Sequence, residues 1–165
     1  MQERAYNVLF LCTGNSARSI LAEAYLNSIS DGRFRAFSAG SHPTGKVNPF
    51  ALDLLQRNHV QTAGLRSKFW DEFAQADAPR MDIIITVCDQ AAGEVCPVWP
   101  GKPITAHWGL EDPAAVEGDD AAKRAAFMKA FATIQKRIAI LISLRPEALE
   151  RTAAEQRITQ SGKNR

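Results

Sequence analysis

Cysteine, charge of one sign and long apolar runs are all scarce in this sequence of 165 residues. The 20 Lys and Arg residues are balanced by 18 Asp and Glu residues. The resulting formal net charge of +2 is too small for a protein dedicated to binding nucleic acids. No run approaches the roughly 18 apolar residues of a membrane-spanning helix. The first ten residues, MQERAYNVLF, lack the apolar core and cleavage site of a secretory signal. We therefore expect a cytoplasmic protein that binds neither membranes nor nucleic acids.

Only three cysteines are present, Cys12, Cys88 and Cys96, which is too few for a secreted disulfide scaffold. An odd count without an export signal indicates a reducing compartment, where thiols pack, bind metals or react. The 45% hydrophobic content is enough for an ordinary core, so neither disulfides nor a metal are needed to hold the fold together.

Apolar runs of strand length alternate with segments of helical periodicity along the chain. Asn48-Pro49 fits a helix cap followed by Pro at the first helical position. We predict strands at 6–11, 35–39, 82–87 and 102–106, and helices at 17–30, 50–58, 69–75 and 120–143. Such alternation predicts a three-layer α/β/α domain with a four-stranded parallel sheet over residues 1–145, followed by a polar tail at 146–165, either a frayed helix or disordered.

The first predicted strand ends at a short loop rich in polar and small residues. In parallel sheets, ligands gather at the carboxyl ends of strands. The loop, with Gly14 and Asn15 where positive φ is useful, can turn its N–H groups inward as an anion nest beside the positive end of a helix. The proposed oxyanion-binding residues are Thr13, Gly14, Asn15, Ser16, Ala17, Arg18 and Ser19.

Cys12 opens this loop and Arg18 closes it. The planar guanidinium of Arg18 suits two oxygens of a tetrahedral oxyanion. The same positive surroundings lower the pKa of a thiol, and Ser19 is placed to donate a hydrogen bond to the sulfur. We interpret the loop as a nucleophile in an oxyanion cradle; the alternative is a buried structural cysteine beside a solvated arginine.

The run VLFLCTGNSARS with a downstream Asp-Pro resembles the low-molecular-weight protein tyrosine phosphatase superfamily. The arsenate reductase branch of that superfamily is the closer match, over approximately residues 5–144. The matching segments are 12–19, Ser38-Ala39-Gly40, Thr86-Val87-Cys88-Asp89, Cys96-Pro97 and HWGLEDP at 107–113. The resemblance implies a four-stranded parallel sheet with helices on both sides, and a site built on the Cys12 loop.

The resemblance also implies that Asp112 is a general acid. Its family equivalent lies on a loop and protonates the departing oxygen. A displacement at an oxyanion centre by a thiolate needs such an acid opposite the sulfur. Glu111 is the competing carboxylate, and we expect it to be a bystander.

The reductase branch implies a relay through the other two cysteines. Cys12 attacks arsenate, and Cys88 attacks the Cys12 sulfur as arsenite leaves. Cys96 then attacks Cys88 and releases Cys12, and the Cys88–Cys96 disulfide is reduced by an external thiol protein. No cofactor or metal is expected. Thioredoxin is the expected reductant, with glutaredoxin, glutathione or mycothiol as alternatives.

Geometry restricts the last disulfide of this relay. Eight residues of helix span about 12 Å, whereas a disulfide needs Cα atoms roughly 4.4–6.8 Å apart. We therefore expect residues 89–95 to bend or unwind. The alternatives are two buried small side chains, or a zinc site with His107 that lacks the usual short Cys-x2-Cys spacing.

Other candidate residues have simpler explanations. His42 and His59 are expected in solvent, and the cations at 123, 124, 129, 136 and 137 on the solvated face of the last helix. Two further functions stay open. One is a tyrosine phosphatase, although Ala114 and Ala115 stand where its relatives frame phosphotyrosine with aromatics; the other is a non-catalytic module that senses an oxyanion or redox state.

Overall fold

The structure is a computed structural model that describes residues 5–87 and 103–143. Cys88, Cys96, the 89–95 segment and the tail from residue 146 therefore lie outside the described residues, and the expectations placed on them stay predictions. Within the described ranges, no helix is long and apolar enough to cross a membrane.

Four parallel strands form the sheet. They are β1 (Tyr6–Cys12), β2 (Phe34–Gly40), β3 (Ile83–Thr86) and β4 (Ile104–His107), in the order β2-β1-β3-β4. The central strand β1 pairs in parallel with β2 and β3, and β3 pairs with β4. The parallel α/β sheet predicted from the sequence is confirmed.

Within the described residues, three α-helices connect and cover the strands: α1 (Arg18–Ile29), α2 (Pro49–Arg57) and α4 (Asp120–Ser143). Two short 3-10 helices, η1 (Trp70–Phe73) and η2 (Pro113–Ala115), lie in the connections. The predicted start of α2 is confirmed, because the Asn48 side chain accepts a hydrogen bond from Phe50 N at 2.8 Å and Pro49 follows the cap.

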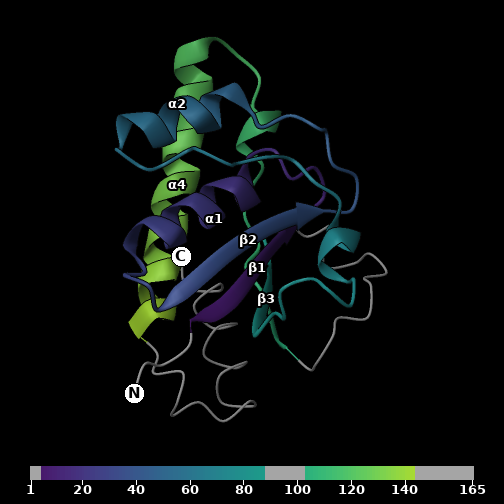
Figure 1. Cartoon of the computed structure of the whole chain (residues 1–165). Coiled ribbons are helices and arrows are strands. Elements are labelled where there is room, and N and C mark those ends of the chain that lie inside the picture. Colours follow the sequence, from purple (N-terminus) through teal and green to yellow (C-terminus); the bar gives the residue numbers. More distant parts are fainter. Residues whose placement is uncertain (1–4, 88–102, 144–165) are drawn as a thin grey trace.

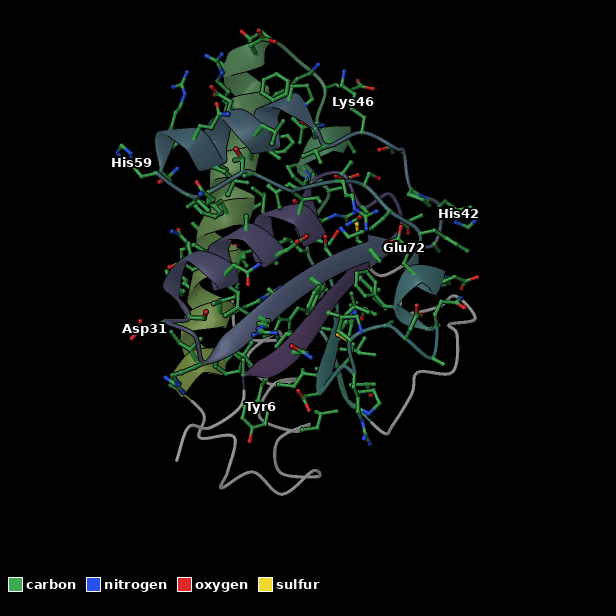
Figure 2. The ribbon with its side chains drawn as sticks, in the orientation of Figure 1. Tyr6, Asp31, His42, Lys46, His59 and Glu72 are labelled. Atoms are coloured by element: carbon green, nitrogen blue, oxygen red, sulfur yellow. The ribbon has the colours of Figure 1, made fainter. Side chains whose placement is uncertain are left out.

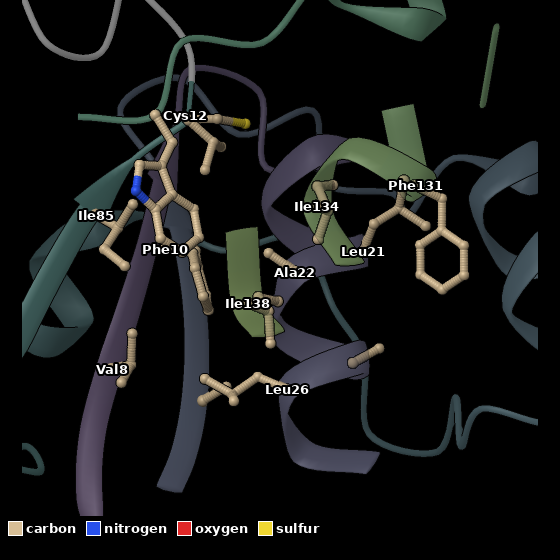
Figure 3. Packing of buried hydrophobic residues seen from close by; sticks show 14 of the residues in the cluster. Val8, Phe10, Cys12, Leu21, Ala22, Leu26, Ile85, Phe131, Ile134 and Ile138 are labelled. Atoms are coloured by element: carbon tan, nitrogen blue, oxygen red, sulfur yellow. The ribbon is translucent and has the colours of Figure 1, made fainter. Parts of the chain in front are cut away.

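The two faces of the sheet bury different side chains because successive residues of a strand point to opposite sides. From β1, Val8, Phe10 and Cys12 join the larger core with residues of α1, α2 and α4, whereas Leu9 and Leu11 join a smaller core with η1. Figure 1 shows the three α-helices on one side of the sheet and η1 beyond the other, and Figure 3 shows the larger core, with Cys12 at the upper end of β1 above Phe10. From Val8 to Cys12, both faces of β1 are buried, which explains the continuous apolar run of this strand.

One prediction about α4 is wrong. Arg137, expected on the solvated face, is buried, with 4% of its surface exposed. It shares the inner face of the helix with Ala130, Ile134 and Leu141. Lys129 and Lys136 are exposed as expected.

Parallel pairing brings the carboxyl ends of the strands to one edge. Cys12 is paired with Gly40, and Thr86 is paired with His107. Val87, which follows β3, donates its N–H to Leu11 O at 2.8 Å. The sequence-predicted loop therefore begins where three strand ends are held side by side.

Candidate active site

The anion loop, residues 12–18, joins the end of β1 to the start of α1. Asn15 has a φ of 46°, the left-handed conformation that Asn adopts more readily than most residues. The expected positive φ is therefore found at Asn15 but not at Gly14, which is absent from the residues with positive φ. A Cβ on Gly14 would lie 3.4 Å from Thr44 Cγ2 and 3.8 Å from Ser16 Oγ, which are ordinary contacts, so neither packing nor backbone strain requires glycine there.

The carbonyl groups of the anion loop are held outward by the segment that follows β2. His42 N donates to Thr13 O at 2.9 Å, Thr44 N to Gly14 O at 3.0 Å and Asn48 N to Ser16 O at 2.9 Å. Because the C=O and N–H of one peptide plane point in opposite directions, these contacts turn the following N–H groups toward the interior of the loop. This is the arrangement of an anion nest.

Gly40 lets the end of β2 approach the first residues of the loop. A Cβ at this position would lie 2.9 Å from Cys12 O and would overlap Thr13 O. Only glycine fits against this backbone, so the Ser38-Ala39-Gly40 segment serves the loop as well as the sheet.

Two donors converge on the Cys12 sulfur, which is almost fully buried. Asn15 N and Ser19 Oγ each donate to Sγ at 3.3 Å. The Ser19 contact is the one predicted from the sequence. Both donors favour a thiolate over a thiol.

The Asn15 side chain links the loop to the interior. Its Nδ2 donates to Ser19 Oγ and to Ser38 Oγ, both at 2.9 Å, while its Oδ1 accepts from Lys68 N at 2.8 Å. Asn15, Ser19 and Ser38 are fully buried. The side chain that stabilises the left-handed turn is thus fixed by groups from α1, β2 and the segment before η1.

A buried ion pair lies at the far end of this network. Lys68 Nζ lies 3.7 Å from Glu23 Oε1, and Glu23 accepts from Ser38 Oγ at 2.5 Å. Burial raises the pKa of the Glu23 carboxyl, and Lys68 opposes that rise. Burial likewise lowers the pKa of Lys68, and Glu23 opposes that fall. Each charge helps the other stay ionised.

Arg18 joins the anion loop to the acid loop, residues 108–112. Its Nη1 donates to Leu110 O at 2.9 Å, and its Nη2 lies 3.6 Å from Asp112 Oδ2. The other oxygen of Asp112 accepts from Ala114 N at 3.0 Å and caps η2. Glu111 is exposed. The structure therefore brings Asp112, and not its neighbour, to the arginine of the anion loop.

Arg137 makes a second tie to the acid loop from α4. Its Nη1 donates to Gly109 O at 2.9 Å. Two arginines from different helices thus hold successive carbonyls, those of Gly109 and Leu110.

An anion loop of this geometry, facing a loop that carries a carboxylate on a four-stranded parallel sheet, invites comparison with known families. The model of the low molecular weight phosphotyrosine protein phosphatase family matches residues 7–155. This chain belongs to that family. The match also extends ten residues past the boundary of the predicted domain at residue 145.

The curated proteins that are similar to this chain include an arsenate reductase from Halalkalibacterium halodurans. It is 36% identical over 131 residues, which cover 79% of this chain and 91% of the relative. Among solved structures, the arsenate reductase from Archaeoglobus fulgidus aligns with a TM-score of 0.65 and 28% identity, covering 83% of this chain and 99% of that one. The thioredoxin-dependent arsenate reductase from Corynebacterium glutamicum shares the fold, with a TM-score of 0.60 and 24% identity over 87% of this chain and 64% of that one.

The fold assembles most of the candidate residues expected for this phosphatase-family site. The loop from Cys12 to Ser19 and the Asp112 carboxylate meet at Arg18. Cys88 and Cys96 lie outside the described residues, so neither the relay nor the zinc alternative is tested. His42 and His59 are exposed at opposite edges of the molecule (Figure 2), as predicted.

Sequence reasoning missed two residues that contact the site, Lys68 and Arg137. Arg137 could have been found, because 130, 134, 137 and 141 follow helical spacing and the other three positions hold Ala, Ile and Leu. Lys68 carries no such signal, since its partners Asn15, Glu23 and Ser38 are distant in sequence.

Proposed function

We propose that this protein is an arsenate reductase, which converts arsenate to arsenite with Cys12 as the nucleophile. The observation that carries the proposal is the buried Cys12 sulfur with two hydrogen-bond donors, in a loop whose carbonyls are turned outward. The curated relatives that match most of this chain and bear the name arsenate reductase support the choice of substrate.

Arsenate is a tetrahedral oxyanion and suits the inward N–H groups of the anion loop. Arg18 lies at the edge of this loop with Nη1 and Nη2 directed to the acid loop. When arsenate binds, the Arg18 guanidinium contacts both the oxyanion and Asp112. Its planar set of donors can serve an arsenate oxygen and a carbonyl together.

In the first chemical step, the Cys12 thiolate attacks arsenic and an S–As bond forms. A hydroxyl group of the arsenate leaves as water after accepting a proton from Asp112, the general acid in this scheme. Asp112 is held beside Arg18 by its Oδ2, and its Oδ1 caps η2. This fixes the carboxyl group on the side of the loop that Arg18 faces.

In the second step, the Cys88 thiolate attacks the Cys12 sulfur and the S–As bond breaks. Its electron pair stays on arsenic, which is reduced from As(V) to As(III) and leaves as arsenite, while the two sulfurs are oxidised to a Cys12–Cys88 disulfide. The Cys96 thiolate then attacks Cys88, which returns Cys12 as a thiolate and leaves a Cys88–Cys96 disulfide.

Regeneration needs two electrons from an external dithiol. We propose thioredoxin as the donor, since a Cys88–Cys96 disulfide presented by one protein is best reduced by the paired thiols of another. Glutaredoxin, glutathione or mycothiol are the other possible donors. Such chemistry fits a reducing cytoplasm and requires no bound cofactor.

The second candidate is phosphotyrosine hydrolysis, because the same loop and acid would serve a phosphate ester. The presence of Cys88 and Cys96, which a phosphatase does not need, favours the reductase. The distinction is measured by arsenite production with thioredoxin, thioredoxin reductase and NADPH, compared with release of nitrophenol from an aryl phosphate.

Three variants separate the steps of this scheme. Cys12→Ser should lose both activities. Cys88→Ser should lose multiple turnover of arsenate and keep slow aryl phosphate hydrolysis. Cys96→Ser should stall after roughly one arsenite per chain with a Cys12–Cys88 disulfide. Full arsenate turnover by Cys88→Ser would exclude the relay, and full turnover by Cys96→Ser would show that Cys96 is not needed to resolve the Cys12–Cys88 disulfide.

A further inference from the structure

Lys68 is an unusual residue for the interior of this protein. Lysines are almost never fully buried unless they are paired, yet Lys68 has only 8% of its surface exposed. Its Nζ donates to Arg66 O at 2.8 Å and to Ser38 Oγ at 3.5 Å, and it lies 3.7 Å from Glu23 Oε1. By contrast, its neighbour Arg66 forms an exposed bidentate pair with Glu72.

The hydrogen bonds around Asn15 have a fixed direction. The Lys68 backbone N–H donates to Asn15 Oδ1, so the Nδ2 group must face the other way, toward Ser19 and Ser38. Both serine oxygens accept a hydrogen from Nδ2. Each hydroxyl therefore passes its own hydrogen onward.

The two arms of this network end on different charged groups. Ser19 donates to the Cys12 sulfur at 3.3 Å, whereas Ser38 donates to the Glu23 carboxylate. The direction of the Ser38 arm depends on Glu23 being an acceptor only, because a protonated Glu23 could donate to Ser38 and reverse that arm, whereas the Ser19 arm is set by the Asn15 amide.

The ammonium of Lys68 keeps Glu23 an acceptor. Burial by itself favours the neutral carboxyl and raises the Glu23 pKa, and Lys68 gives the largest opposing effect. The exposed Arg66 contributes in the same direction and is the smallest of the effects on Glu23. Lys68 thus acts on the network twice, through its backbone N–H at Asn15 and through its side chain at Glu23 and Ser38.

We propose that Lys68 is a positioning residue: its ammonium supplies an internal cation to the site beside Glu23 and Ser38, and its backbone N–H, through Asn15, keeps the Ser19 hydroxyl donating to the nucleophile. It does not touch the substrate or the reacting sulfur. The inference rests on the proposed role of Cys12 as a thiolate, and it predicts that removing the ammonium makes that thiolate less stable.

The test measures the pH dependence of Cys12 alkylation in the full-length chain. Iodoacetamide reacts with the thiolate, and mass spectrometry of the Cys12 peptide gives its rate separately from the other cysteines. In Lys68→Met, which keeps the apolar stem, the midpoint should rise by about one pH unit, a roughly tenfold loss of thiolate below the midpoint. The control is Lys46→Met, which removes the same charge at an exposed position (Figure 2) and should leave the midpoint unchanged.

A second variant keeps the test informative if Lys68→Met folds poorly. Lys68→Ala leaves a space for the missing side chain, and n-propylammonium should move the midpoint back toward the wild-type value in the same sample. The uncharged n-propanol should not.

An unchanged midpoint in both Lys68 variants would overturn the proposal and leave Lys68 a purely structural residue. An equal rise in Lys46→Met would also overturn it, because the effect would then come from overall charge. Alkylation needs no arsenate, so either result stands even if the protein fails to reduce arsenate.

Discussion

The two loops that meet at Arg18 are held in different ways. The anion loop is fixed by backbone N–H groups from His42, Thr44 and Asn48 and by its close approach to Gly40. The acid loop is tied by arginine side chains that donate to Gly109 and Leu110. A backbone frame has no rotamers to change, whereas a side-chain tie can be released by rotation about its χ angles. The candidate site therefore combines a loop held by backbone contacts with a second loop whose side-chain ties can be released.

The largest effect is expected when the acid itself is removed. Asp112→Asn keeps the cap of η2 through its side-chain oxygen but cannot give a proton to the leaving oxygen. Single-turnover arsenite release should slow by roughly 10²–10⁴-fold, the usual contribution of a positioned acid. Glu111→Gln is the matched control and should remain near wild type. A larger loss in Glu111→Gln would mean that the wrong carboxylate has been named.

Adding one carbon atom at Gly40 should displace the anion loop. In Gly40→Ala, the Cβ would lie 2.9 Å from Cys12 O and 3.0 Å from the Thr13 carbonyl carbon, and backbone atoms cannot step aside as a flexible side chain can. We expect a loss of about 2–3 kcal/mol in unfolding free energy and about 100-fold in turnover, because the loop is displaced.

The control for Gly40→Ala is Gly14→Ala, measured by thermal unfolding alone. A Cβ at Gly14 would lie 3.4 Å from Thr44 Cγ2 and 3.8 Å from Ser16 Oγ, which are ordinary contacts, so the unfolding temperature of Gly14→Ala should change much less. Equal destabilisation of the two variants would contradict the close-approach argument for Gly40.

Loosening the acid loop should have a smaller effect on the rate. Arg137→Met removes the tie to Gly109 O and leaves every contact of the anion loop in place. We expect kcat to fall about tenfold, the effect of leaving one buried acceptor without its donor, with little change in KM for arsenate. Arg124→Met, at an exposed position of the same helix, is the control. A raised KM with an unchanged kcat would show that Arg137 supports binding instead.

The smallest effect concerns stability and pH at the buried pair behind the anion loop. Burial raises the pKa of Glu23, so the folded chain holds this proton to higher pH than the unfolded chain and loses stability as pH rises through that interval. Lys68→Met removes the opposing charge and widens the interval. The destabilisation caused by the mutation should therefore grow between about pH 4 and 7, by on the order of 1 kcal/mol. Urea unfolding at several pH values measures it; a pH-independent difference would mean that the lost charge does not act on Glu23.

The main features of the fold were predictable because they depend on local pattern. The continuous apolar run of β1, the Asn48-Pro49 start of α2 and the helical periodicity of α4 are all present in the structure. The core position of Arg137 was misjudged because a charged residue type was given more weight than its spacing. Its hydrogen bond to Gly109 O is a tertiary contact that no local rule describes.

The features of the site also divide into those that depend on local sequence and those that depend on tertiary contacts. The sequence by itself determined the order of groups from Cys12 to Arg18, the left-handed Asn15 and the place of the Asp112 carboxylate soon after β4, since each depends on residues close together in the chain. Only the tertiary structure decided that Gly40 must lack a side chain, that Arg18 faces the acid loop and that Lys68 lies beside Glu23. Those outcomes depend on strands and helices packed together from distant parts of the chain, where burial removes water and makes each charge and hydrogen bond depend on its nearest partner.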